Sequence, residues 1–158
     1  MDSLASGAGR SPPTPGGLID ILLVEDSATD AELTRQVLLE AKVRSNLRIV
    51  RDGDSAMAFL KGRAPYEGSR LPDLILLDLN LPGMDGRAVL AEVKGDDDLK
   101  QIPVVVLSAS PADEDVASAY AHQANAYIRK PADLDEFVEC MKLLEAFWLS
   151  MVRLPPAR

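Results

Sequence analysis

Residues 74–79 read LILLDL and residues 104–108 read VVVLS, and these two runs decide the fold. Each is almost continuously apolar, whereas a strand with one face in water alternates between apolar and polar residues. Continuous apolar runs are typical of parallel strands, because the helices that connect such strands cover both faces of the sheet. We therefore expect a parallel sheet with these two strands at its centre.

Further short apolar runs alternate with helical patterns along the chain from Leu18 onward, which is typical of a parallel sheet joined by crossover helices. The expected strands are Asp20–Glu25, Leu47–Arg51, Leu74–Leu79, Pro103–Ser108 and Ala126–Arg129. Right-handed crossovers and five strands favour an α/β, doubly wound, flavodoxin-like (βα)5 fold with strand order 2-1-3-4-5 as the simplest solution. The expected helix caps are Ser27 with Asp30 three residues on, Asp52 or Asp54, and Ser110 with Pro111 at the first helical position.

Composition limits the class of protein. The 158 residues carry a net charge of −8, which disfavours nucleic acid and anionic membranes as partners. No apolar run approaches the roughly 20 residues that span a bilayer, and the single cysteine suits a reducing compartment, so we expect a cytoplasmic protein. We divide the chain into a disordered leader (1–17), one domain (18–146) and a C-terminal extension of the last helix (147–158).

Polar side chains gather where the expected strands end: Glu25 and Asp26, Asp78, Ser108, and Lys130. Ligands of such sheets bind beyond these carboxyl ends. Each residue alone has an ordinary structural explanation, such as a helix cap, a strand-end hydroxyl or a surface lysine. Asp78, however, stands inside an apolar run, where an unpaired carboxylate costs several kcal/mol. This position favours a functional site.

The charge of this cluster points to a metal. Three carboxylates and one ammonium leave two negative charges uncompensated, and carboxylates about 4 Å apart repel by about 4 kcal/mol at an effective dielectric constant of 20. The absence of His and Cys from the cluster disfavours zinc, while carboxylates with open water positions suit magnesium, which often shares its shell with a phosphate. The residues therefore predict an acidic magnesium site that receives a phosphoryl group.

Four motifs now identify a resemblance. VEDS (24–27), LLDLNLPGMDG (76–86), VVVLSAS (104–110) and AYIRKP (126–131) resemble the receiver domain of bacterial two-component response regulators, in the order that the family has them. The resemblance covers residues 19–144. Residues 62–83 and the FWLSMVRLP ending (147–155) further resemble single-domain regulators that are paired with phytochrome-type histidine kinases.

The resemblance implies a role for each site residue. Asp78 would be the phosphoacceptor for a kinase phosphohistidine, Lys130 would pair with a phosphate oxygen, and Ser108 would bind another. Magnesium would be held directly by Asp26, Asp78 and the main-chain carbonyl of Asn80, and through water by Glu25. Ser108 and Tyr127 would form the conformational switch, and the Lys130–Pro131 bond would be cis. The protein would be a signalling protein rather than an enzyme, although it would catalyse its own phosphorylation and slow self-dephosphorylation.

Two residues depart from the family pattern. Gln123 stands where the family usually ends its fourth helix with a left-handed glycine, which predicts backbone strain of about 1 kcal/mol. Ser108 replaces the more common threonine, keeping the hydroxyl and losing a methyl group. We expect structural roles for the single histidine, His122, at a helix surface or cap, and for Cys140 as a buried thiol.

Other functions remain as alternatives. A non-phosphorylated pseudo-receiver scaffold would have the same fold but would lose Asp78, Asp26 or Lys130, and all three are present. An aspartyl-phosphate hydrolase of the haloacid dehalogenase type needs a second acid two residues after the nucleophile, where this chain has Asn80. A flavin-binding protein would need hydroxyl-rich phosphate loops and stacking aromatic residues near the first strand.

The last helix has more apolar surface than one domain needs. Its expected core stripe is Leu134, Phe137, Val138, Met141 and Leu144. Beyond it lie Phe147, Trp148, Leu149, Met151, Val152 and Leu154. Aromatic residues and methionine are enriched at protein interfaces, so we expect a homodimer through this helix and its extension. The alternative is that the extension folds back to complete the core.

Overall fold

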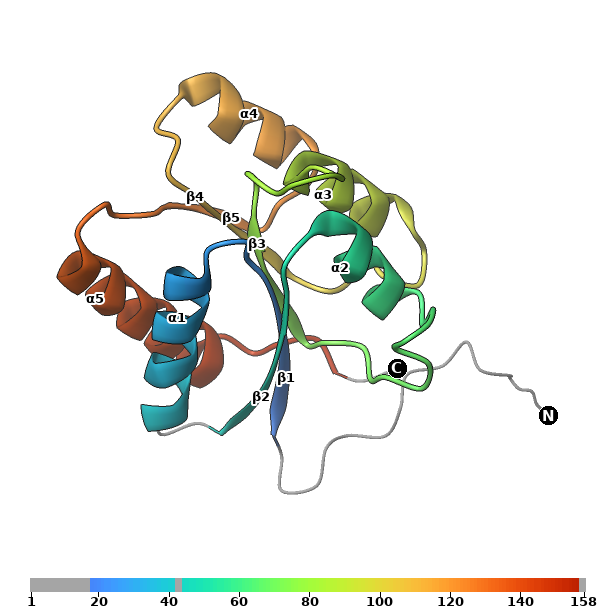
Figure 1. The fold of residues 1–158 in the computed structure, drawn as a ribbon, viewed down its shortest axis with the longest axis horizontal. Helices are drawn as coiled ribbons and strands as arrows, with labels where there is room; N and C mark the ends of the chain where they lie inside the picture. The colour runs from blue at the N-terminus through green and yellow to red at the C-terminus, as the bar shows by residue number, and fades with distance from the viewer. Residues whose placement is uncertain (1–17, 42–43, 157–158) are drawn as a thin grey trace.

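Five parallel strands form one sheet in the order β2-β1-β3-β4-β5 in the computed structural model, which describes residues 18–41 and 44–156 (Figure 1). The strands are β1 (Ile19–Val24), β2 (Ser45–Val50), β3 (Leu74–Asp78), β4 (Val104–Ser108) and β5 (Ala126–Arg129). The predicted order and all five strands are confirmed, with ends that differ from the prediction by two residues at most. The expected leader lies outside the described residues.

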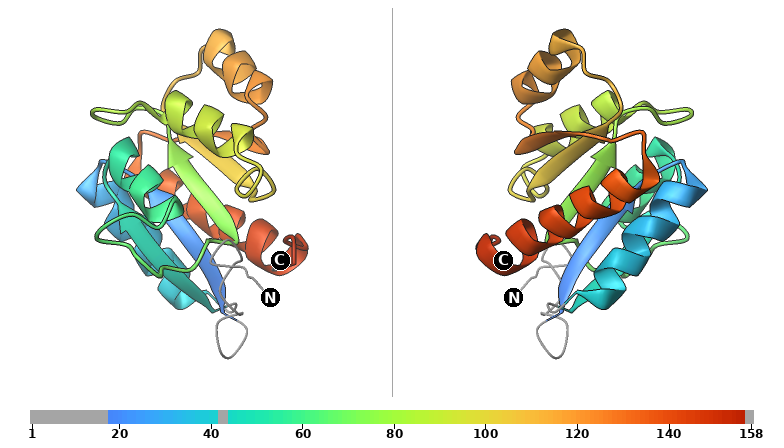
Figure 2. Two further views of the ribbon diagram at one scale, coloured as in Figure 1. Left: turned by 90° about the vertical axis from the view of Figure 1, so that its right-hand side faces the viewer. Right: turned by 90° about the vertical axis from the view of Figure 1, so that its left-hand side faces the viewer.

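Helices cover both faces of this sheet. They are α1 (Ala28–Glu40), α2 (Gly53–Leu60), α3 (Gly86–Gly95), α4 (Asp113–Ala121), α5 (Leu134–Glu145) and the π-helical turn η2 (Ala146–Met151), which continues α5. Figures 1 and 2 show α1 and α5 together on one face and α2 and α3 on the other, with α4 next to α3. The sheet is therefore the middle of three layers.

The two central strands are buried at every position, as their sequences predicted. Their side chains alternate between two cores, because successive residues of a strand point to opposite faces. Ile75 and Leu77 belong to the core beneath α2 and α3, while Leu74 and Leu76 belong to the core beneath α1 and α5. This burial places the carboxyl end of β3 between two packed layers.

Two of the expected helix caps are confirmed and one is wrong. The side chains of Ser27 and Asp52 cap α1 and α2. Ser110 does not cap α4, which begins at Asp113 after a residue without a capping side chain. The Ser110 hydroxyl instead accepts from the backbone N–H of Ala112 and donates to Asp115, so it shapes the turn before the helix.

After η2, the C-terminal extension runs past the amino ends of β3 and β4. Leu149 is buried in the core of α1 and α5, with Trp148 packed against that core. Pro155 and Pro156 line a small cavity with residues such as Pro72 and Pro103, which precede β3 and β4. Between residues 18 and 156, leaving out 42 and 43, no helix combines the length and the apolar character needed to cross a membrane.

Candidate functional site

Three strand ends bring a lysine and carboxylates together at one edge of the sheet. The Lys130 Nζ, which follows β5, lies 2.7 Å from Oε1 of Glu25 after β1 and 3.3 Å from Oδ2 of Asp78 at the end of β3. All three side chains are at most 10% exposed. The sequence predicted this convergence, since the carboxyl ends of parallel strands meet at the same edge.

Asp78 is held in place by the backbone around it. Its Oδ1 accepts a hydrogen bond of 3.0 Å from the N–H of Asn80. The first residue of α3, Gly86, packs so closely on this loop that a Cβ there would lie 2.3 Å from the Asp78 carbonyl oxygen. The close approach of α3 therefore fixes the backbone from which the Asp78 carboxylate projects.

Burial changes the protonation behaviour of the site. Loss of solvent, followed by the hydrogen bond to Asp78, raises the pKa of Glu25 to about 7, although Lys130 acts in the opposite direction. Burial also disfavours the charged form of Lys130, but its hydrogen bonds to Glu25 and Asp30 outweigh this and raise the lysine pKa. The ammonium is thus firmly charged, and the carboxylates remain in excess over it.

The predicted magnesium ligands are partly brought together. Glu25 and Asp78 are buried and adjacent, while Asp26 and Asn80 are exposed beside them. Within the described part of the chain, no group of three or more His, Cys, Asp or Glu residues is arranged as a metal site. The donor chemistry nevertheless fits a hard divalent cation, because the carboxylate oxygens outnumber the one ammonium that neutralises them.

The lysine reaches the site without the expected cis bond. Among the described residues, the only cis peptide is Ala64–Pro65, so the expectation for Lys130–Pro131 is wrong. The backbone N–H of Lys130 donates to the carbonyl oxygen of Ser108 at 2.7 Å, which extends the ladder between β4 and β5 by one residue. This bond aligns the lysine with the end of β4.

The two predicted switch residues meet at the loop between β4 and α4. Oγ of Ser108 accepts a hydrogen bond from the N–H of Ser110, and the Tyr127 hydroxyl donates to the Ser110 carbonyl oxygen at 3.0 Å. Tyr127 is half-buried against the core of α2 and α3. The serine and the tyrosine therefore contact the same residue from two sides.

Ser110 also connects this loop to α3 and α4. Its hydroxyl donates to Asp115 Oδ2 at 2.6 Å, and Asp115 Oδ1 lies 2.8 Å from the Arg87 guanidinium. The hydrogen bond from Ser110 and the contact with Arg87 lower the pKa of Asp115. Sequence reasoning missed this network, because Arg87 and Asp115 are 28 residues apart and neither lies in an apolar run.

Sequence reasoning also missed Asp30. Its Oδ2 lies 2.9 Å from Lys130 Nζ, closer than the Asp78 oxygen. The Ser27–Asp30 spacing predicted only a cap, and the Ser27 Oγ does accept from the Asp30 N–H. The Ser27 N–H, however, donates to Glu25, so the Asp30 carboxylate is free to turn toward the lysine.

Comparison with known proteins agrees with this geometry. Residues 21–142 match the response regulator receiver domain family. The chain is 49% identical over 137 residues to response regulator Rcp1 of Synechocystis sp., a match that covers 87% of this chain and 93% of Rcp1.

Two solved structures are also similar. The Mn²⁺-bound form of Rcp1 has a TM-score of 0.85 and 48% identity, with coverage of 87% of this chain and 99% of that one. The phosphorylated cyanobacterial phytochrome response regulator RcpA also has a TM-score of 0.85, with 46% identity over 88% of this chain and 99% of that one. The residues that match the family, 21–142, contain β2 to β5, most of β1 and the whole cluster around Lys130, so this chain belongs to the response regulator receiver domain family.

Proposed function

We propose that this chain accepts a phosphoryl group on Asp78 from a histidine kinase and transmits the signal through a change in its surface. The observation that carries this proposal is the buried Asp78 carboxylate at the end of β3, with the Lys130 ammonium 3.3 Å away. A nucleophilic oxygen and a fixed positive charge at one point are what phosphoryl transfer requires of a protein. The phosphorylated state of the similar RcpA supports the same reading.

In this reaction an Asp78 carboxylate oxygen forms a bond to phosphorus while the bond from phosphorus to the imidazole nitrogen of the kinase breaks. The product is an acyl phosphate, and Lys130 stabilises charge on a phosphoryl oxygen. The Ser108 hydroxyl would donate a hydrogen bond to another phosphoryl oxygen. Water would later cleave the acyl phosphate slowly, so the protein acts as a signalling protein with slow self-dephosphorylation. Self-dephosphorylation would reset the signal. Alternatively, the chain would pass the phosphoryl group onward.

Magnesium is the cation we propose for the site, in line with the Mn²⁺ bound by the similar Rcp1. Asp26, Asp78 and the Asn80 main-chain carbonyl would hold it directly, and Glu25 would do so through water. When bound, the cation would neutralise the excess carboxylate charge and the charge of the arriving phosphoryl group. The exposure of Asp26 and Asn80 leaves these ligands open to solvent, from which both cation and phosphodonor arrive.

The switch would operate through Ser110. A phosphoryl group on Asp78 would draw the Ser108 hydroxyl away from the Ser110 N–H, and the loop that Tyr127 holds through the Ser110 carbonyl would shift with it. The phosphoryl group needs to favour one packing by only a few kcal/mol to move the population. The face of α4, β5 and α5 would carry the change.

The kinase partner that we propose is of the phytochrome type, because the similar RcpA is a phytochrome response regulator. Nucleic acid is not an expected partner of a chain with a net charge of −8. The single cysteine suits the reducing cytoplasm, which is the location we propose.

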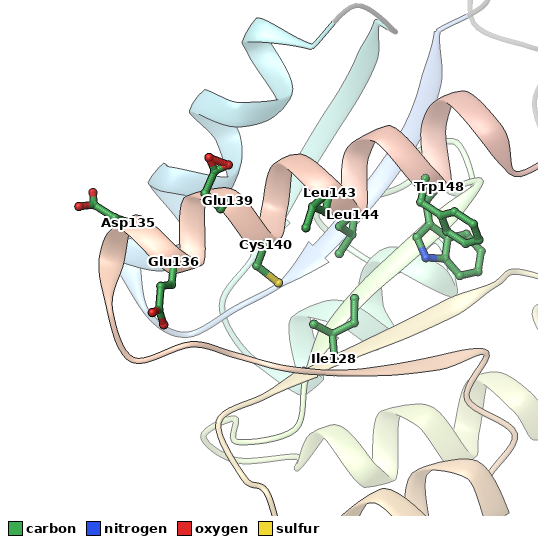
Figure 3. Close-up of a pocket in the computed structure, with 9 residues that line it drawn as sticks. Ile128, Asp135, Glu136, Glu139, Cys140, Leu143, Leu144 and Trp148 are labelled. Atoms are coloured by element: carbon green, nitrogen blue, oxygen red, sulfur yellow. The ribbon is translucent and has the colours of Figure 1, made fainter.

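A homodimer through α5 and η2 is the second partner that we propose. Leu143, Phe147 and Met151 follow one another at four-residue spacing and are 72%, 51% and 75% exposed. Leu143 and Phe147 line a groove of about 550 Å³ together with Ile128, Trp148 and the half-buried thiol of Cys140 (Figure 3). An exposed apolar stripe beside an apolar groove is typical of a protein–protein interface.

The decisive experiment is mass spectrometry of the intact protein after incubation with acetyl phosphate and magnesium. We expect the wild type to gain one phosphoryl group of about 80 Da. Asp78→Asn should gain none, while the control Asp113→Asn, which changes an exposed acid at the start of α4, should gain it normally. A folded wild type that gains nothing would favour the pseudo-receiver scaffold, and a phosphorylated Asp78→Asn would contradict the assignment of the residue.

A further inference from the structure

Asp30 is a third carboxylate on Lys130, and neither the motifs nor the proposed reaction gives it a role. We infer that Asp30 is a positioning residue, which holds the lysine aimed at Asp78 before phosphorylation and releases it to the phosphoryl group afterwards. The inference rests on the proposed function of Asp78.

The hydrogen-bonding capacity of Lys130 is fully used before any phosphoryl group arrives. An ammonium has three N–H donors, and Lys130 Nζ has three carboxylate neighbours: Glu25 at 2.7 Å, Asp30 at 2.9 Å and Asp78 at 3.3 Å. A phosphoryl oxygen would be a further acceptor. One carboxylate must therefore yield its place on the lysine when Asp78 is phosphorylated.

Glu25 and Asp78 are poorly suited to leave. Glu25 is 1% exposed, and its second oxygen accepts from the Ser27 N–H at 3.1 Å. Asp78 carries the phosphoryl group itself, and its other oxygen accepts from the Asn80 N–H at 3.0 Å. Glu25 would have to break its second hydrogen bond and find another partner in a buried place. Asp78 stays beside the lysine because the phosphoryl group is bonded to it.

Asp30 is well suited to leave. Its side chain is 24% exposed at the first turn of α1, and within the described residues its carboxylate contacts Lys130 alone. It can turn to water without leaving a buried acceptor unpaired, and the positive end of the α1 dipole stabilises its charge in either position. The backbone of Asp30 is held independently, because its N–H donates to the Ser27 Oγ and its carbonyl accepts from Thr34.

Competition for the lysine predicts how long the phosphoryl group lasts. In the wild type, Asp30 continues to compete with the phosphoryl oxygen for Lys130 and repels its negative charge. Asp30→Asn keeps the shape and removes the charge, so the lysine stays with the phosphoryl group. We expect the half-life of the acyl phosphate to increase about fivefold, a factor that corresponds to roughly 1 kcal/mol.

The test measures loss of the phosphoryl group from the full chain by intact mass spectrometry, after acetyl phosphate is removed and with magnesium present. Asp30→Glu keeps a carboxylate within reach of Lys130 and should return the half-life close to that of the wild type. Glu32→Gln, which removes an equal charge from an exposed position on the same helix, should leave it unchanged. Circular dichroism establishes that each variant is folded.

Each result has one meaning. Equal half-lives of wild type and Asp30→Asn, or a shorter one in the variant, overturn the role of Asp30 while leaving phosphorylation of Asp78 intact. An equal increase in Glu32→Gln also overturns it, because the effect would then be one of overall charge. If the folded wild type acquires no phosphoryl group at all, it is the proposed function that fails.

Discussion

Gln123 is the residue at which this chain accepts a backbone conformation that suits glycine. Its φ is 70°, which confirms the expected left-handed conformation. The N–H groups of Gln123 and Ala124 donate to the carbonyls of Tyr120 and Ala119, which closes α4 in a Schellman motif after the cap residue His122. The Schellman motif requires a left-handed residue at this position. The strain therefore arises because a glutamine, which has a Cβ, occupies the position, and not from the turn itself.

Replacing Gln123 with glycine should therefore stabilise the domain. Glycine adopts a positive φ without steric cost, and we expect the free energy of unfolding to rise by about 0.5–1 kcal/mol. Ala121→Gly, at the last residue of α4, should instead lower the free energy of unfolding. Urea unfolding of the two variants and the wild type measures both changes, and a Gln123→Gly protein no more stable than the wild type would contradict the reading.

Glu25 should make stability depend on pH. Its pKa is raised from 4.5 to about 7, chiefly by burial, so the folded state binds this proton more tightly than the unfolded chain does. The resulting stabilisation is complete below about pH 4.5 and is lost as the pH rises to about 7. Between about pH 5 and pH 8, the wild type should lose stability relative to Glu25→Gln.

Thermal unfolding across this pH range, without magnesium, measures the difference between the two proteins. Glu40→Gln, at an exposed position of α1, should follow the wild type throughout. A gap between wild type and Glu25→Gln that does not change with pH would show that Glu25 does not titrate in this window.

At the level of elements, α3 positions the phosphoacceptor through Gly86. A Cβ at this residue would lie 2.3 Å from the Asp78 carbonyl oxygen and 2.6 Å from Leu79 Cα, both of which belong to the backbone. Neither atom can move aside as a flexible side chain can. The first turn of α3 and the end of β3 therefore form one rigid unit.

Gly86→Ala should disturb stability and chemistry together. We expect a loss of about 1–3 kcal/mol, since the backbone must shift to accept the methyl group, and slower phosphorylation by acetyl phosphate because Asp78 shifts with it. Gly95→Ala, at the other end of α3, meets nothing within 4 Å and should be neutral or stabilising. Denaturant unfolding and the phosphorylation rate are measured for both, and a Gly86→Ala protein that matches the wild type in both would contradict this role of α3.

For the molecule as a whole, the extension after α5 serves two purposes. Leu149 is buried and Trp148 packs on the core, so part of the extension completes the domain. Phe147 and Met151, which alternate with them, face outward. The predicted core stripe of α5 divides in a similar way, because Phe137, Met141 and Leu144 are buried, Val138 is partly buried, and Leu134 is 55% exposed.

The outward residues can be tested without disturbing the buried ones. Phe147→Ser combined with Met151→Ser should weaken self-association by about 2–4 kcal/mol, the range that buried aromatic anchors contribute at interfaces. Leu39→Ser, on α1 and 72% exposed, is the matched control and should leave self-association unchanged. Sedimentation over micromolar concentrations measures both. A monomeric wild type, or a double variant that associates as tightly as the wild type, would contradict the dimer.

The sequence by itself determined the strands and the convergence of Glu25, Asp78 and Lys130, whereas it favoured the strand order only as the simplest solution. Local patterns suffice for these features, because the continuous apolar runs of β3 and β4 identify buried parallel strands and the topology of parallel strands brings their ends together. The left-handed conformation of Gln123 was expected from the family pattern, in which a glycine usually ends this helix.

Only the tertiary structure decided how the site residues pair. Asp30 and Lys130 are 100 residues apart, and their contact depends on how α1 lies against the end of β5. The turn before α4 depends in the same way on the hydrogen bonds of the Ser110 hydroxyl with Asp115 and with the N–H of Ala112. Periodicity records which residues are buried, but it carries no information about which exposed or half-buried polar groups meet, because those contacts are set by the packing of whole elements.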